Sequence, residues 1–388
     1  MVIHGHAARQ YGNRLKSQHL MQIAFRTDAS LQIGTGHVMR CLTMADALRG
    51  HGAQSTFICR PHAGHLLDLV RQRGHTAIVL DPADDAFPPP VDPSHAKWLG
   101  TDWARDAEQT QQALGDRVVD CLVVDHYALD GRWEQALRPR TKRIMVIDDL
   151  ADRPHECDLL LDQSLGRQAT DYAGLLIHNT PTLIGPAYAL LRPEFAQWRE
   201  HSLQRRAQPQ LKNLLITMGG VDQPNATGQV LDAMTHSNLP ADLRITVVMG
   251  SAAPWLAQVQ SQAAAMPRTT RVLVAVDNMA QLMAESDLCI GAAGSTSWER
   301  CCLGLPAIQC VLATNQKEIN SALELAGAVL TVELAKLRDA LPILIDQLTR
   351  ADVLKQLSRS ASGICDGLGA NKSIQWLEKV TNEDLPAL

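Results

Sequence analysis

The sequence predicts an α/β protein with two doubly wound domains that face a central cleft. Short apolar strands alternate with segments of helical periodicity along most of the chain. A strand, a glycine-containing loop and a helix open the first half near residue 21, and the same order starts again near residue 211. Strands that are apolar throughout, such as 121–124, are typical of a parallel sheet covered by helices on both faces.

The composition is that of a globular protein with more than one domain. Of the 388 residues, 46% are hydrophobic and 20% are charged, and the formal net charge is −5. This length corresponds to roughly two or three domains, and this balance excludes an intrinsically disordered chain. The small acidic excess and the 4% of aromatic residues argue against a nucleic-acid partner.

Three features predict a cytoplasmic protein without membrane contact. The nine cysteines are scattered, with no Cys-x-x-Cys pair, which is typical of free thiols in a reducing compartment. No apolar run reaches the about 18 residues that span a bilayer. Residues 1–20 lack the apolar stretch of a signal peptide and show no periodicity, so we expect a disordered extension there. A monomer is the working expectation for the oligomeric state.

The expected elements fall into two series. In the first half we expect strands at 21–26, 55–59, 76–80, 120–125, 143–147 and 158–161. Apolar residues from Val38 to Leu48 recur at helical spacing and predict a helix after the first strand. In the second half a helix should begin near Asn225, and strands are expected at 211–217, 244–249, 270–274, 287–290 and 307–311.

A polar, basic stretch at 191–210 separates the two series and predicts a linker. We therefore expect an N-terminal domain at 21–190 and a C-terminal domain at 211–388. The stretch 81–92 contains four prolines and should be a surface loop. In doubly wound domains ligands bind at the carboxyl ends of the strands, so a site is expected in the cleft.

A glycine-containing loop follows the first strand. Residues 33–40 read IGTGHVMR, which matches neither the dinucleotide fingerprint nor a P-loop. Glycines at a helix start let a ligand approach backbone amides, which favour anions. His37 would lie at that helix start, although a histidine that only caps its own loop is an equal alternative. The candidate ligand-binding residues of this region are Arg26, Asp28, Gly34, Gly36 and Arg40.

Polar residues also follow later strands. Asp125 and Tyr127 come directly after a buried strand, and they could hold a sugar hydroxyl or orient a catalytic imidazole. The simpler alternative is a packed Tyr127 with Asp130 as a helix cap. The adjacent carboxylates 148–149 suit either a metal or acid/base pair or helix capping. Taken alone, Asn371 is a capping residue in a turn between helices.

Two loops of the second half repeat the pattern. The double glycine 219–220 suits a phosphate or a plain turn. In the segment 291–299 the hydroxyl groups can donate to phosphate oxygens, and Glu299 can accept from ribose hydroxyls. Residues 296–299 also form a capping box, which is compatible with that role. The candidate ligand-binding residues here are Gly219, Gly220, Asn225, Gly294, Ser295, Thr296 and Glu299.

Searches of the sequence for metal and nucleophile motifs are negative. It contains no His-Glu-x-x-His, no zinc-spaced Cys/His set and no Gly-x-Ser-x-Gly elbow. We therefore expect a nucleotide-handling site that uses neither a metal nor another cofactor.

Six segments together resemble the UDP-2,4-diacetamido-2,4,6-trideoxy-β-L-altropyranose hydrolases of bacterial pseudaminic acid biosynthesis. They occur in the family's order and span most of the chain from Met21 onward. The segments are FRTD at 25–28, GTGHVMR at 34–40, VDHY at 124–127, GPAYALLRPEF at 185–195, GGVDQPNAT at 219–227 and AGSTSWE at 293–299.

This resemblance implies two Rossmann-like domains of the glycosyltransferase-B type, as in the peptidoglycan N-acetylglucosaminyl transferase. It implies hydrolysis of that UDP-sugar to the free sugar and UDP, in a pathway that leads to flagellin glycosylation. The first domain would be catalytic, with His37 as the base, and the second would bind UDP. The residues carried over to the UDP side are Gly294, Ser295, Thr296 and Glu299, and Tyr127 and Asn371 are carried over as further site residues. The resemblance gives no role to 1–20 or to the region 81–115.

Two other classes of protein fit the same residues. A UDP-sugar-dependent glycosyltransferase would share the nucleotide site but would need an acceptor groove and often a membrane-facing patch. No basic amphipathic helix stands out in the sequence, which weighs against membrane docking. A nucleotide-sugar sensor would need the UDP loop but not His37. Turnover of a UDP-sugar without an acceptor distinguishes the three.

Overall fold

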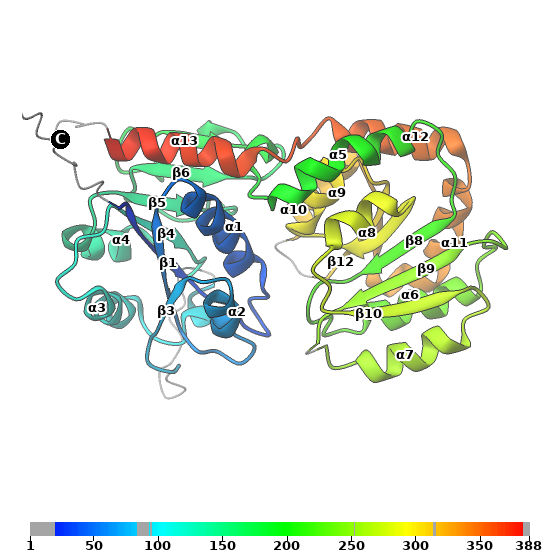
Figure 1. Ribbon diagram of the computed structural model, residues 1–388, viewed down its shortest axis with the longest axis horizontal. Helices are drawn as coiled ribbons and strands as arrows, with labels where there is room; N and C mark the ends of the chain where they lie inside the picture. Colours follow the sequence, from blue (N-terminus) through cyan, green and yellow to red (C-terminus); the bar gives the residue numbers. More distant parts are fainter. Residues whose placement is uncertain (1–19, 84–92, 94, 252, 313–315, 383–388) are drawn as a thin grey trace, which may run out of the picture.

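The protein consists of two α/β domains that lie side by side, as seen in a computed structural model (Figure 1). The structure describes residues 20–83, 93, 95–251, 253–312 and 316–382. The expected extension at 1–20, except Leu20, and most of the proline-rich loop lie outside these residues. Each domain contains one parallel sheet between two layers of helices. This arrangement confirms the predicted fold class of two doubly wound, Rossmann-like domains.

The first domain is built on a seven-stranded parallel sheet in the order β3-β2-β1-β4-β5-β6-β7. Side chains of β1 alternate between two cores, because Ile23 and Phe25 pack on one face of the sheet and Ala24 on the other. The strands are β1 Gln22–Thr27, β2 Gln54–Cys59, β3 Thr76–Val79, β4 Cys121–Asp125, β5 Ile144–Ile147, β6 Leu159–Asp162 and β7 Thr182–Ile184. The helices between them are α1 Gly36–Gly50, α2 Leu67–Gln72, α3 Trp103–Leu114 and α4 Gly131–Leu137.

The second domain repeats this plan with a six-stranded parallel sheet in the order β10-β9-β8-β11-β12-β13. Its strands are β8 Asn213–Thr217, β9 Arg244–Met249, β10 Thr270–Val274, β11 Leu288–Ala292, β12 Ala307–Val311 and β13 Leu330–Glu333. Its helices are α6 Ala226–Thr235, α7 Leu256–Ala265, α8 Met279–Glu285, α9 Thr296–Cys302, α10 Lys317–Leu325, α11 Leu337–Leu348 and α12 Ala351–Ser362. Across the described part of the chain, none of the helices has both the length and the hydropathy to cross a bilayer.

The expected linker at 191–210 is largely a helix, α5 (Pro193–Arg205), that packs against α8 and α9 of the second domain. Its polar, basic composition predicted a linker, but two of its arginines bind carbonyl oxygens of the domain. Arg199 donates to the carbonyl groups of Cys365 at 2.9 Å and Ser362 at 2.8 Å. Arg206 likewise donates to Ser286 O at 2.8 Å. The second domain therefore begins earlier than the sequence predicted.

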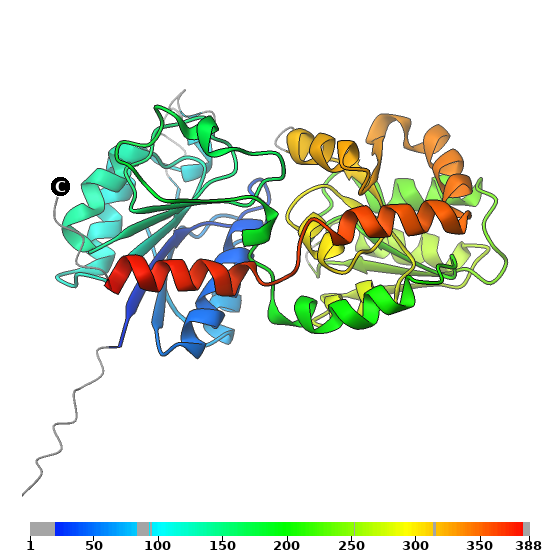
Figure 2. The same ribbon diagram turned by 90° about the horizontal axis from the view of Figure 1, so that it is seen from above.

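The last helix, α13 (Gly369–Asn382), belongs to the first domain. The expected C-terminal domain of 211–388 had placed this segment in the second domain. Ala370, Ile374 and Leu377 lie on one side of the helix and join the same core as α1 and β6. Figures 1 and 2 show α13 lying along the first domain after the chain has crossed back. The two short edge strands β7 and β13 were also not expected from the sequence.

Candidate active site in the cleft between the domains

A cavity of about 350 Å³ lies between the two domains, at the carboxyl ends of strands from both sheets. The first domain lines it with loops that follow β1, β4, β5 and β6, and the second with loops that follow β8, β11 and β12. Doubly wound folds bind ligands in this position. The residues singled out from the sequence that line it are Gly34, Gly36, His37, Arg40, Tyr127, Gly219, Gly220, Gly294, Ser295 and Thr296.

The loops of the two domains approach each other closely in this cleft. A Cβ added to Gly36 would lie 3.5 Å from Ser295 Oγ, and one added to Gly220 would lie 3.8 Å from Thr35 Cγ2. Gly34 and Gly219 have φ angles of 81° and 84°, a region that other residues adopt only with strain. Gly34 and Gly219 therefore give the two loops a backbone conformation that other residues would strain.

His37 lies in the first turn of α1 and makes a buried contact with Asp125 at the end of β4. Its Nδ1 is 2.6 Å from Asp125 Oδ1, so Nε2 is the ring nitrogen left for the cavity. Arg40, one turn along α1, donates to both oxygens of Asp125, at 2.6 Å to Oδ2 and 2.7 Å to Oδ1. Burial alone would raise the pKa of Asp125, but the charges of Arg40 and His37 lower it well below its usual range. An ionised Asp125 thus orients the imidazole.

A second carboxylate, Asp149, extends this network along the cavity wall. Its Oδ2 accepts hydrogen bonds from Arg40 at 2.6 Å and from the Tyr127 hydroxyl at 2.8 Å. The ring of Tyr127 meets the ring of His37 edge-on, with 4.5 Å between centroids. Tyr127 is therefore packed, as the simpler alternative predicted, and it is also part of the cavity wall.

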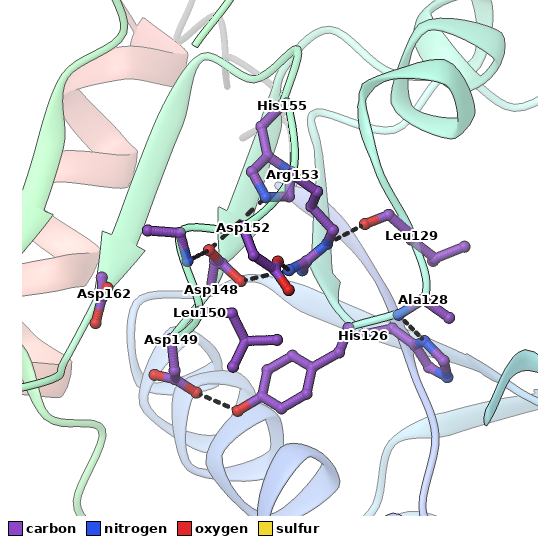
Figure 3. A network of polar contacts seen from close by, with 12 residues as sticks. His126, Ala128, Leu129, Asp148, Asp149, Leu150, Asp152, Arg153, His155 and Asp162 are labelled. Atoms are coloured by element: carbon purple, nitrogen blue, oxygen red, sulfur yellow. Dashed lines mark hydrogen bonds and ion pairs between the residues drawn. The ribbon is translucent and has the colours of Figure 1, made fainter. Parts of the chain in front are cut away.

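The neighbouring carboxylate, Asp148, points away from the cavity. Figure 3 shows Asp148 and Asp149 turned to opposite sides of the loop after β5. Asp148 pairs with Arg153 at 2.8 Å and accepts from the Ala151 amide at 2.8 Å. Burial would raise the pKa of Asp148, but Arg153 and His155 lower it to about 2. The two residues therefore do not act as a pair, and no cluster of potential metal ligands occurs among the residues that the structure describes.

Several candidates from the sequence do not line the cavity. Arg26 and Asp28 are fully buried and pair with each other at 2.8 Å, and Arg26 also binds Asp106. They belong to a buried network of charged side chains at the carboxyl end of β1. This position corrects the expectation that they bind substrate. Asn225 caps α6 by accepting from the Gly228 amide, and Asn371 is exposed on α13.

Glu299 lies one turn along α9 from Ser295, next to the cavity wall but outside its lining. Its side chain is partly exposed, and Ser295 makes no side-chain cap at the start of the helix. Burial raises the pKa of Glu299 to about 7, against the opposing charges of Arg192 and Arg300. A residue of this kind changes its charge near neutral pH.

Sequence reasoning missed Trp98 and left Asp149 undecided. Asp149 is the second residue after the buried strand β5, so its position near a strand end was a usable signal. Trp98 is contributed by the short 3₁₀ helix η1 (Ala96–Leu99), within the region 81–115 that had no expected role. Nothing in the local sequence pattern indicates that this tryptophan reaches the cleft.

Comparison with known proteins first identifies the structural class of this protein. Residues 213–362 match the model of the "Glycosyltransferase family 28 C-terminal domain". The whole fold is similar to the crystal structure of MurG from Acinetobacter baumannii, with a TM-score of 0.66 and 17% identity over 92% of this chain and 99% of that one. It is also similar to CalG4, the calicheamicin glycosyltransferase, with a TM-score of 0.61 and 14% identity over 95% of this chain and 100% of that one. The protein thus has the two-domain glycosyltransferase-B fold.

A more specific relative comes from the sequence. The chain is 28% identical over 279 residues to the UDP-2,4-diacetamido-2,4,6-trideoxy-β-L-altropyranose hydrolase of Campylobacter jejuni subsp. jejuni serotype O:2. The match covers 71% of this chain and 86% of the relative. The resemblance that the six sequence segments predicted is therefore confirmed.

Proposed function

We propose that this protein hydrolyses a UDP-sugar to the free sugar and UDP, by attack of water at the anomeric carbon. The observation that carries the proposal is the buried contact between His37 Nδ1 and Asp125 at the wall of the cleft. An imidazole held in this way offers Nε2 as a general base to a water molecule in the cavity.

Attack of water at the anomeric carbon needs a general base more than a strong acid. As the water oxygen bonds to the anomeric carbon, one of its protons passes to His37 Nε2. The bond between that carbon and the UDP oxygen breaks, and UDP leaves with the electron pair. Asp125, ionised and fixed by Arg40, stabilises the imidazolium that forms. A single displacement of this kind inverts the configuration at the anomeric carbon.

The second domain would hold the nucleotide. Its loops at 218–222 and 292–296 face His37 across the cavity and offer backbone amides and the hydroxyls of Ser295 and Thr296. The match of residues 213–362 to a glycosyltransferase C-terminal domain supports this assignment. Gly219, Gly220 and Gly294 would lie beside the diphosphate, and Glu299 beside the ribose.

The name of the Campylobacter relative supports a specific substrate, UDP-2,4-diacetamido-2,4,6-trideoxy-β-L-altropyranose. With this substrate the protein would act in pseudaminic acid biosynthesis, in the cytoplasm. It would use neither a metal nor another cofactor.

Hydrolysis of this substrate in ¹⁸O-labelled water tests the proposal. With no acceptor present, we expect one UDP per free sugar, with the label on the anomeric oxygen of the sugar. The first-formed sugar anomer, followed by NMR, should have the inverted configuration. Label on the UDP phosphate would mean attack at phosphorus and would contradict the mechanism.

A second candidate is a UDP-sugar-dependent glycosyltransferase, which the family 28 C-terminal domain favours. Such an enzyme would use the same cleft and the same base to activate an acceptor hydroxyl in place of water. It would release UDP slowly or not at all until an acceptor is added. The acceptor-free assay therefore decides between the two candidates.

A further inference from the structure

Part of the cavity wall beside His37 is aromatic, and the proposed chemistry does not use it. Trp98 stacks on Tyr127 with 5.8 Å between ring centroids and an angle of 24° between the planes. Tyr127 in turn contacts the imidazole of His37. Trp98 is partly exposed and lines the cavity, so a ligand bound next to His37 can contact its indole.

The position of Trp98 is fixed by its neighbours. The ring of His95 meets Trp98 edge-on at 4.5 Å and Tyr127 at 5.4 Å. On the same turn, Ala96 and Leu99 are buried in the first domain. The indole is therefore a built part of the cleft and not a surface side chain that happens to lie near it.

Next to this aromatic wall, Asp149 lines the cavity, and one of its two carboxylate oxygens has no hydrogen-bond partner. The side chain is 10% exposed, and its Oδ2 is occupied by Arg40 and Tyr127. Its Oδ1 is buried and accepts no hydrogen bond from any residue that the structure describes. A buried carboxylate oxygen without a donor is unfavourable, so a bound ligand that donates a hydrogen bond would be stabilised there.

The charges on this side of the cleft disfavour a phosphate group. Asp125 and Asp149 are two carboxylates, and the guanidinium of Arg40 pairs with both. Asp125, Asp149 and Arg40 together carry one net negative charge, which disfavours a diphosphate. We therefore expect the group that binds beside Trp98 to belong to the sugar and to combine a hydrogen-bond donor with apolar surface.

We propose that Trp98 and Asp149 form a subsite for an N-acylamino group of the sugar. The amide N–H of that group donates to Asp149 Oδ1, and its methyl group packs on the indole of Trp98. A hydroxyl group also donates to Asp149, but it brings no methyl group to the indole. The subsite rests on the proposed function in one respect, namely that the cleft binds a UDP-sugar.

Ligand binding tests the subsite separately from hydrolysis. Binding is measured by calorimetry in a His37→Asn background, so that no ligand is consumed. The probes are UDP, the UDP-diacetamido sugar, and the matched UDP-sugar with hydroxyls in place of both acetamido groups. We expect the acetamido sugar to bind about 10–100-fold more tightly than its hydroxyl analogue, the range that one buried methyl group gives.

Adding Trp98→Ala should reduce this preference to within about threefold and leave UDP affinity unchanged, whereas Trp98→Phe should restore part of it. Adding Asp149→Asn should weaken the acetamido sugar at least about tenfold, because the amide nitrogen can replace the acceptor with a donor. Trp376→Ala, at a partly exposed tryptophan outside the cavity, is the matched control and should change nothing.

A preference that survives Trp98→Ala, or an equal loss for UDP and both sugars, would overturn the subsite. Binding of UDP without binding of either sugar nucleotide would overturn it as well. A different result would contradict the hydrolase proposal. In that case the unmodified protein would bind the acetamido sugar with the same preference but would release no UDP.

Discussion

The Asp125 carboxylate serves two side chains, since it orients His37 and neutralises Arg40. In Asp125→Asn, the amide can donate to Nδ1, which would leave the proton on Nε2 and remove the base. We expect kcat to fall by roughly 10²–10⁴, with UDP affinity little changed. Steady-state kinetics and calorimetry measure the two quantities.

A double-mutant cycle shows whether Asp125 acts through His37. His37→Asn alone should also lower kcat by roughly 10²–10⁴, and the double variant should be no slower than this single variant. Losses that multiply would show that Asp125 has an independent role. Thermal unfolding of each variant separates a loss of catalysis from a loss of folded protein.

Glu299 predicts a pH dependence of nucleotide binding. Its pKa is about 7, so the carboxylate is protonated below that pH and is a poor acceptor for ribose hydroxyls. UDP affinity should therefore increase as the pH is raised through 7, beyond the change caused by the titration of UDP itself. Glu299→Gln should lose this extra dependence, and Glu299→Ala should weaken UDP binding by about 1–3 kcal/mol at pH 8. Equal pH profiles for the variants and the unmodified protein would remove Glu299 from the ribose site.

At the scale of single residues, the sequence predicted the glycine loops and His37 because their positions follow from strand ends and helix starts. The sequence could not show that Arg40 lines the cavity whereas Arg26 is buried away from it. Arg26 lies near the end of β1 and Arg40 lies in α1, the helix that follows, but Arg26 turns to the face of the sheet that α3 covers. There it meets Asp106, 80 residues later in the chain. A local pattern does not contain such a distant partner.

At the scale of elements, the Arg26 network joins β1 and β2 to α3. Asp106 accepts hydrogen bonds from Arg26 at 2.7 Å, Arg60 at 2.7 Å and the Trp133 indole at 3.0 Å, and all of these side chains are buried. Asp106→Ala would leave two guanidinium groups without this partner. We expect the free energy of unfolding to fall by roughly 3–5 kcal/mol, measured by chemical denaturation.

An exposed ion pair gives the matched control. Asp68 and Arg71 pair at 2.9 Å on α2, but Asp68 is 79% exposed. Asp68→Ala should therefore change the free energy of unfolding by less than about 1 kcal/mol. Similar losses for the two substitutions would mean that the buried network does not stabilise the fold.

Most elements could be predicted because their apolar periodicity is local. The expected strands that begin each half were found as β1 and β8, with the expected helices after them. Helices α5 and α13 were placed wrongly, since their sequences show amphipathic or basic character but not the domain against which they pack. Their positions depend on contacts such as Arg199 with the carbonyl of Cys365 and Ile374 with the core of the first domain.

At the scale of the whole molecule, the first domain is assembled from two separate parts of the chain. Ile374 of α13 is fully buried in its core, so Ile374→Ala should lower the stability of the first domain by about 2–5 kcal/mol. Hydrogen exchange should show the loss in β1 and β6 and not in β8. Gln375→Ala, at the next and exposed position, should show no such loss. Equal protection in both variants would contradict the role of α13 in the core.

The chain also crosses between the domains twice, at 185–192 and at 363–368 (Figure 2). The crossings lie close together, since a Cβ on Gly369 would come within 2.3 Å of the Ala189 carbonyl oxygen. We expect two adjacent covalent connections to act as a hinge, because two connections restrict sliding and twisting more than one would. Rotation at the two crossings would separate the loops that meet in the cleft, where Gly36 faces Ser295. Substrate admission and release of both products would then share one motion, and the rate of that motion would set an upper limit on turnover.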